Sequence, residues 1–167
     1  MVMNNVVLAI DPGASNTQRS TVIIVATNVD YVKRTYDLLD HFRCLFDERK
    51  YISNFLALYA HRIETIILED FVLFDTHAMH QVGSRFETVK VIERITYDCE
   101  RLGIADKIVM RMSSAKETAK GMPPEHLAQL IQWQPDAKQR RHYISAYRHL
   151  RAYVFDRSIQ LKKLVDK

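Results

Sequence analysis

The stretch Val6-Val7-Leu8-Ala9-Ile10-Asp11-Pro12-Gly13 decides the fold of this chain. Its five apolar residues, rich in β-branched side chains, are typical of a short, fully buried β-strand. A second run, Thr65-Ile66-Ile67-Leu68, leads in the same way into Glu69-Asp70. A carboxylate at the end of a buried strand lies where the sheet meets solvent. Two neighbouring strands of this kind would bring Asp11 and Glu69 together.

Paired carboxylates are costly unless a cation neutralises them. The cations that oxygen ligands prefer are hard ions such as Mg²⁺ or Mn²⁺, which serve phosphoryl chemistry. The sequence therefore indicates a divalent-metal site at Asp11 and Glu69. The alternative is that Asp11 only begins a turn, because Asp-Pro-Gly is also favourable turn chemistry.

Length and composition fit one globular domain. The chain has 167 residues, of which 47% are hydrophobic, so we expect a single domain over residues 1–167. No apolar run has membrane-spanning length, and the first one is cut short by Asp11, which argues against a signal peptide. Cys44 and Cys99 are too few for a disulfide framework. We expect both to be buried free thiols in helices of a cytoplasmic protein.

Periodicity predicts alternating strands and helices in the remainder of the chain. Gly103 follows the longest amphipathic pattern as a helix cap. The predicted strands are residues 6–10, 20–27, 30–39, 65–69 and 107–112, and the predicted helices are 42–61, 82–102, 124–131 and 138–164. The first two strands should form a hairpin, and the third should lie at an exposed edge. This order predicts an α/β protein with a mixed sheet.

The C-terminal third concentrates positive charge. The whole chain carries a net charge of +4, and its pI is near 9.1. The cationic residues of this third are Lys138, Arg140, Arg141, Arg148, Arg151, Arg157, Lys162 and Lys163. Tyr143, Tyr147 and Tyr153 are interleaved with them, and basic plus aromatic side chains suit a phosphate backbone and exposed bases. Tyr143 and Tyr147 also fall on the apolar side of the predicted helix, with Leu150 and Val154. The alternative is a solvated helix face.

Three motifs together carry a resemblance to a known family. AIDPG on the first strand, ILED on the fourth and HYISAYRHL on the last helix resemble the RuvC-type Holliday-junction resolvases. The chain is most similar to their bacteriophage branch, within the ribonuclease H-like superfamily, from Val6 to about Phe155. The resemblance implies a ribonuclease H-like fold, with a mixed five-stranded sheet flanked by helices.

The same resemblance implies a set of active-site residues. Asp11 and Glu69 correspond to metal-binding carboxylates of the family. Its C-terminal signature is an acid or His, two further residues, and then Asp-Ala. His142 matches the His-bearing version and would complete the metal site, whereas Ser145 stands where the family places an aspartate.

Ser145 is the main departure from the family pattern. A neutral hydroxyl is a poor ligand for a hard divalent ion, so the second ion of a two-metal site would be held less tightly. The spacing of His142, Ser145 and His149 places all three on one helical face. Asp136 or Asp70 are candidates to compensate for the missing carboxylate, although neither matches the motif.

The resemblance also implies residues that contact DNA. Lys116 and Lys120 are similar to basic residues near the cleaved phosphate. The other implied DNA contacts are Phe71, Phe74, Gly83, Arg85, Lys138, Arg140, Arg141 and Arg148. Phe71 and Phe74 would wedge into DNA, with packing under the second long helix as the alternative. Gly83 would let a helix N-terminus approach a phosphate.

Three functions remain open. The first is a Mg²⁺-dependent endonuclease, with Mn²⁺ as a possible substitute, that resolves Holliday junctions or other branched DNA in recombination, repair or phage DNA processing. The second is a degenerate resolvase that binds branched DNA without cutting it, because Ser145 replaces the expected aspartate. The third is another activity of the superfamily, such as RNA hydrolysis. Symmetric cutting of two strands needs two active sites, so the resemblance implies a homodimer in a bacterial or phage-infected cell.

Overall fold

Five strands form one mixed sheet. The computed structural model describes residues 5–13, 20–70, 82–112 and 121–165. The strands are β1 (Val6–Asp11), β2 (Thr21–Asp30), β3 (Thr35–Cys44), β4 (Ile63–Asp70) and β5 (Ile108–Met112). They lie in the order β3-β2-β1-β4-β5. The β1–β2 and β2–β3 pairs are antiparallel, whereas β1–β4 and β4–β5 are parallel. The predicted five-stranded mixed sheet is confirmed.

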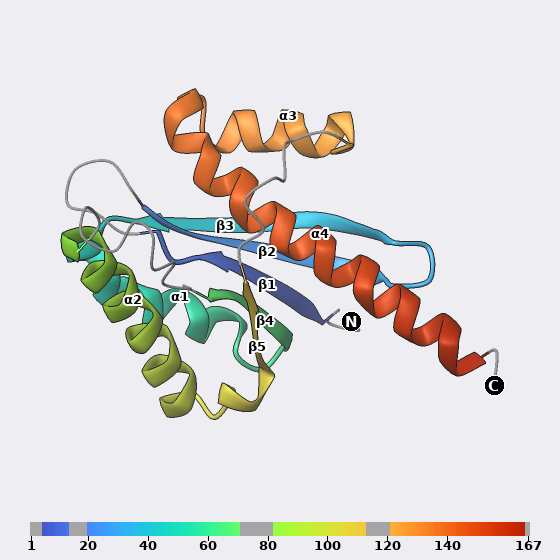
Figure 1. Cartoon of the computed structure of the whole chain (residues 1–167), viewed down its shortest axis with the longest axis horizontal. Coiled ribbons are helices and arrows are strands. Elements are labelled where there is room, and N and C mark those ends of the chain that lie inside the picture. Colours follow the sequence, from blue (N-terminus) through green and yellow to red (C-terminus); the bar gives the residue numbers. More distant parts are fainter. Residues whose placement is uncertain (1–4, 14–19, 71–81, 113–120, 166–167) are drawn as a thin grey trace.

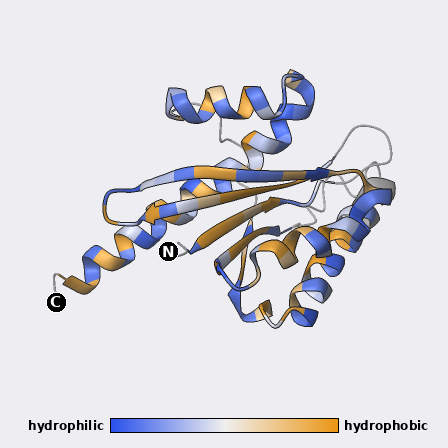
Figure 2. Cartoon of the chain, turned by 180° about the vertical axis from the view of Figure 1, so that it is seen from behind, coloured by the Kyte–Doolittle hydropathy of each residue, from blue (hydrophilic) through white to orange (hydrophobic). Residues whose placement is uncertain are grey.

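Helices cover both faces of this sheet (Figure 1). The helices are α1 (Ile52–Tyr59), α2 (Val82–Arg101), α3 (Pro124–Trp133) and α4 (Ala137–Val165), with 3₁₀ turns η1 (Phe46–Tyr51) and η3 (Ala105–Lys107). One apolar core lies between the sheet and α1 and α2, and a second lies between the sheet and α3 and α4. Figure 2 shows hydrophobic residues running along the central strands, as burial on both faces requires. Within the described part of the chain, no helix combines the length and apolar character needed to cross a bilayer.

The predicted element order is correct, but the segment between residues 30 and 44 differs from expectation. The predicted strand 30–39 contains the turn that separates β2 from β3. Asp30 Oδ1 fixes this turn by accepting hydrogen bonds from the Val32 and Lys33 backbone N–H groups, and Arg34 adopts a positive φ of 60°. Such side-chain capping competes with continued strand pairing.

The predicted helix from Phe42 is also wrong at its start. Phe42 lies on β3, and its ring stacks on Phe55 of α1, with 5.0 Å between centroids. The apolar pattern that begins at Phe42 therefore belongs to two elements that pack on each other, the end of β3 and α1, rather than to one helix. Cys44 likewise lies on a strand, whereas Cys99 lies on α2. Both are buried free thiols as predicted, and burial raises the pKa of each to about 12.

Candidate active site

Strand pairing brings Asp11 and Glu69 to one edge of the sheet. Asp11 ends β1, and Glu69 is the penultimate residue of β4. Because Ile10 lies opposite Leu68 in this parallel pair, the next residues, Asp11 and Glu69, lie at the same level. Ile10 and Leu68 pack against α1 and α2. Side chains alternate along a strand, so both carboxylates face α4 instead.

Helix α4 presents three side chains to these carboxylates. His142 Nδ1 lies 3.1 Å from Asp11 Oδ2. Ser145 Oγ donates to Glu69 Oε2 at 3.3 Å, and His149 Nε2 lies 3.3 Å from the same oxygen. The expectation that His142, Ser145 and His149 share one helical face is confirmed. The helix thus pairs each carboxylate with one histidine.

Gly13 closes the turn against the same cluster. Its backbone N–H donates to Asp11 Oδ1 at 2.7 Å, so the turn chemistry of Asp-Pro-Gly is real and also orients the carboxylate. A Cβ built at Gly13 would lie 2.9 Å from both Asp11 Oδ1 and His142 Nδ1. Any side chain here would therefore displace the Asp11–His142 pair. The turn and the candidate site are one feature, not alternatives.

A cavity of about 230 Å³ opens at this edge of the sheet. Its lining residues are Asp11, Pro12, Gly13, Glu69, Thr88, Arg141, His142 and Ser145. Thr88 of α2 is buried, whereas Arg141 is exposed. A guanidinium can bind phosphate oxygens with two parallel hydrogen bonds. The cavity therefore offers carboxylates for a cation and one arginine for an anion.

The protonation of His142 follows from its partner. An ionised carboxylate only accepts hydrogen bonds, so His142 Nδ1 donates to Asp11, and Nε2 keeps the lone pair when the ring is neutral. Nε2 is buried and has no hydrogen-bond partner among the described residues. Metal-binding histidines usually donate their other ring N–H to a carboxylate or carbonyl. In the neutral ring, His142 Nε2 thus offers a lone pair that can bind a metal ion or accept a hydrogen bond from water.

The donor set fits a hard divalent ion with retained water. Among the described residues, no group of three or more His, Cys, Asp or Glu side chains is arranged to hold one metal ion. Mg²⁺, however, is typically bound through one or two carboxylates and keeps several water molecules. The carboxylates of Asp11 and Glu69 meet that requirement. The orphaned His142 Nε2 gives the cluster a further donor.

Other predicted residues lie away from this cavity. Asp136 Oδ1 accepts a hydrogen bond from the Gln139 backbone N–H at the start of α4. Neither Asp136 nor Asp70 lines the cavity, so neither supplies the missing carboxylate there. Lys138 is exposed on the first turn of α4. Arg140 donates to the backbone carbonyls of residues 134 and 135, which ties α4 to the end of α3.

Several predicted DNA contacts fall outside the described residues. These are Phe71, Phe74, Lys116, Lys120 and the Arg85 side chain. Gly83 lies in the first turn of α2, where the resemblance placed it. Arg148 is half-buried on α4.

The structure places two tyrosines on the apolar side of α4, as the helical pattern predicted, and not on a surface that could bind bases. Tyr143 and Tyr147 are each only 1% exposed, in the core beneath α4. They therefore cannot stack on exposed DNA bases as the interleaved pattern suggested.

The sequence analysis did not assign a role to His149. Its spacing of seven residues from His142, two helical turns, was the signal that could have identified it.

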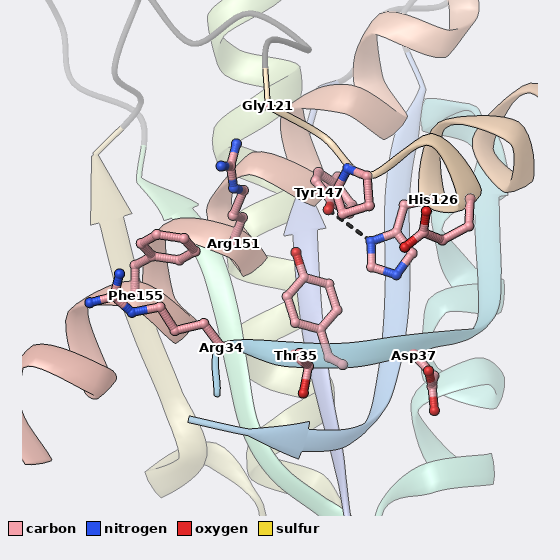
Figure 3. Close-up of a pocket in the computed structure, with 11 residues that line it drawn as sticks. Arg34, Thr35, Asp37, Gly121, His126, Tyr147, Arg151 and Phe155 are labelled. Atoms are coloured by element: carbon pink, nitrogen blue, oxygen red, sulfur yellow. Dashed lines mark hydrogen bonds between the residues drawn. The ribbon is translucent and has the colours of Figure 1, made fainter. Parts of the chain in front are cut away.

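A second cavity, of about 390 Å³, lies further along α4 (Figure 3). It is formed by the start of β3, the N-terminal part of α3 and α4, and none of the predicted active-site residues that the structure describes lines it. His126 Nδ1 lies 2.9 Å from the Tyr147 hydroxyl, and the His126 ring stacks on Tyr36. Burial lowers the pKa of His126. This cavity is separate from the carboxylate cluster.

The fold is that of a known resolvase, although sequence comparison gives no match. No protein-family model and no curated protein matches the chain. The structure is similar to Thermus thermophilus RuvC in complex with a Holliday junction substrate, with 12% identity and a TM-score of 0.55, over 92% of this chain and 95% of that chain. A fowlpox virus resolvase in complex with Holliday junction DNA matches with 13% identity and a TM-score of 0.40, over 97% and 99%. The likeness to RuvC establishes the ribonuclease H-like fold that the three motifs implied.

Proposed function

We propose that this chain is a divalent-metal-dependent endonuclease that resolves Holliday junctions or other branched DNA. The observation that carries the proposal is the pairing of Asp11 and Glu69 at one sheet edge, each beside a histidine of α4. The fold shared with RuvC, which is seen bound to a Holliday junction, supports the same substrate. Such an enzyme would act in the cytoplasm, in recombination, repair or phage DNA processing.

In this proposal Asp11 and Glu69 would hold Mg²⁺, for which Mn²⁺ can substitute, and His142 would complete the metal site through a water molecule that the ion retains. The ion would supply charge for the scissile phosphate and an activated water. Gly13 and His142 fix the Asp11 carboxylate. Lys116 and Lys120 would steady the phosphate, while Arg141 binds a neighbouring one. Fixed charges of this kind accelerate a reaction by stabilising the charge that develops in the transition state.

The remaining DNA contacts would extend from this cavity along the molecule. Lys138 and Arg141 are exposed at the start of α4, and Arg141 lines the cavity of the carboxylates. The further proposed contacts are Phe71, Phe74, Gly83, Arg85, Arg140 and Arg148. A four-way junction has two strands to cut at equivalent positions, so we propose that the chain acts as a homodimer with one site per subunit.

One observation favours a second candidate function. Ser145 Oγ donates a hydrogen bond to Glu69, so the position of the expected aspartate adds no charge to the site. A site short of one carboxylate holds a second cation less tightly. The alternative is therefore a protein that recognises branched DNA without cutting it.

One experiment separates these functions. A labelled four-way junction and a linear duplex of the same sequence are incubated with the protein in Mg²⁺ and, separately, in EDTA. If the chain is an endonuclease, we expect Mg²⁺-dependent cuts in the junction only. The alternative predicts selective junction binding with no cuts in either condition. Equal affinity for the two DNAs together with no cutting would contradict both. In each case the log of affinity should fall with the log of salt concentration, because phosphate contacts release counterions.

A further inference from the structure

We propose that His149 is a positioning residue that holds Glu69 in its metal-binding orientation. The inference rests on the proposed metal site and adds a residue to it. His149 lies one helical turn beyond Ser145 and reaches the second carboxylate of the pair. It therefore acts through Glu69 rather than on the DNA itself.

The contacts around Glu69 Oε2 carry the argument. Ser145 Oγ and His149 Nε2 each lie 3.3 Å from this single oxygen. Because an ionised carboxylate only accepts hydrogen bonds, the His149 nitrogen that faces Glu69, Nε2, is the one that carries a proton. Two donors on one oxygen restrain the terminal rotation of a long, flexible side chain. Glutamate needs this restraint more than the shorter Asp11, which is held by the Gly13 backbone.

The surroundings of His149 make it a rigid support. Its side chain is only 8% exposed, compared with 18% for Glu69. One helical turn further along α4, the Tyr153 hydroxyl lies 3.3 Å from Thr65 Oγ1 on the same face of β4. Leu150, beside His149, is fully buried in the core under α4. These contacts fix the register of α4 on β4, and that register places His149 opposite Glu69.

The two histidines form a repeated arrangement across the site. His142 binds the carboxylate at the end of β1, and His149, two turns later, binds the carboxylate of β4. In both cases an imidazole N–H orients a carboxylate, which is the role of outer partners in metal sites. Ser145, lying between them, adds only a neutral hydroxyl. His149 therefore compensates in orientation, though not in charge, for the missing aspartate.

The test compares two substitutions, of which only one keeps a hydrogen-bond donor at this position. His149→Phe keeps the ring volume and removes the donor, whereas His149→Gln replaces Nε2–H with an amide N–H. Mn²⁺ binding is measured by calorimetry without DNA, and cleavage kinetics are measured on the junction. Loss of such an outer partner costs roughly 10–100-fold in metal affinity or activity. We expect His149→Phe to weaken Mn²⁺ binding by that factor and to lower kcat with little change in KM, and His149→Gln to retain most of both.

His126→Phe is the matched control. His126 also binds a side chain of α4, the Tyr147 hydroxyl, but in the second cavity (Figure 3). The His126→Phe substitution should lower the melting temperature and leave Mn²⁺ affinity unchanged. If His149→Phe does not fold, His149→Met replaces it, because methionine adapts to irregular core space.

The outcomes distinguish this inference from the proposed function. If the unsubstituted chain binds Mn²⁺ and His149→Phe binds it equally well, the positioning role is overturned while the metal site stands. Equal losses in His149→Phe and His149→Gln would likewise overturn it, since the hydrogen bond would not matter. If the unsubstituted chain binds no Mn²⁺, both the metal site and the role of His149 fail.

Discussion

The two faces of the sheet differ sharply although the same strands form both. On the α1 and α2 face, the side chains of Leu8, Ile10 and Leu68 contribute only apolar atoms to the core. On the α4 face, the alternate residues of β1 and β4 become polar towards the strand ends, where Asp11 and Glu69 meet two histidines. The α1 and α2 face contributes mainly to stability, whereas the α4 face contributes both to stability and to the candidate active site.

The difference shows why the chemistry depends on α4. A buried polar group is costly unless it is hydrogen-bonded. Helix α4 supplies those partners from residues that alternate with apolar ones, such as Ala146 and Leu150. Its packing and its function are therefore coupled, whereas α2 contributes Thr88 to the cavity and packs mainly against the apolar face of the sheet.

The largest expected effect is the loss of cleavage in Asp11→Asn. The amide keeps the shape of the side chain but removes the charge that a divalent cation requires. We expect junction cleavage to fall roughly a thousandfold, about 4 kcal/mol of transition-state stabilisation. Thermal stability should change little, and junction affinity measured in Ca²⁺ should remain. Cutting that survives in Asp11→Asn would eliminate the shared metal site.

A pair of core truncations tests the comparison of the two faces directly. Ile95→Ala under α2 and Leu150→Ala under α4 each remove a fully buried side chain. Both should lower the free energy of unfolding by about 2–5 kcal/mol, measured by urea titration. At a temperature where both are folded, only Leu150→Ala should also slow junction cleavage, because α4 carries His142 and His149. Equal cleavage rates in the two variants would break the proposed coupling of α4 to the site.

A smaller effect is expected at Ser145. Ser145→Asp adds an anion beside Glu69, which favours a second divalent cation. We expect junction cleavage to rise about tenfold, equivalent to about 1.4 kcal/mol, and the Mg²⁺ concentration for half-maximal rate to fall. The measurement is one Mg²⁺ titration of both forms. Brisk cutting by the unsubstituted chain with no gain in Ser145→Asp would show that the hydroxyl is not a deficiency.

The sequence was most informative where local pattern and tertiary role agree. The run before Asp11 is apolar because β1 is buried on both faces, and this run predicted a fully buried strand that ends at a carboxylate. The region 30–44 was misread because Asp30 caps a turn, and because Phe42, at the end of β3, lies three residues before Leu45 and so extends the helical pattern of α1. Local periodicity cannot separate these cases.

The partners within the site were only partly predictable. Helical spacing placed His142, Ser145 and His149 on one face, but not which carboxylate each would reach. That depends on the register of α4 on β4, which is fixed by distant contacts such as Tyr153 with Thr65. The role of Tyr143 was similarly undecided, since the same tyrosine pattern fits a buried core and a stacking surface. Burial in the core beneath α4 decides it.

The smallest expected effect concerns the surface contact between α4 and the sheet. Arg111 of β5 and Asp156 of α4 form an ion pair at 2.6 Å, with side chains 26% and 55% exposed. Exposed pairs contribute at most about 1 kcal/mol and are screened by salt. Asp156→Asn should therefore lower the melting temperature by about 4 °C or less, and the difference should shrink in about 1 M NaCl. Cleavage should be unchanged, because the buried core, not this pair, sets the position of α4. A loss of stability or cleavage as large as that of Leu150→Ala would show instead that the surface pair holds the helix on the sheet.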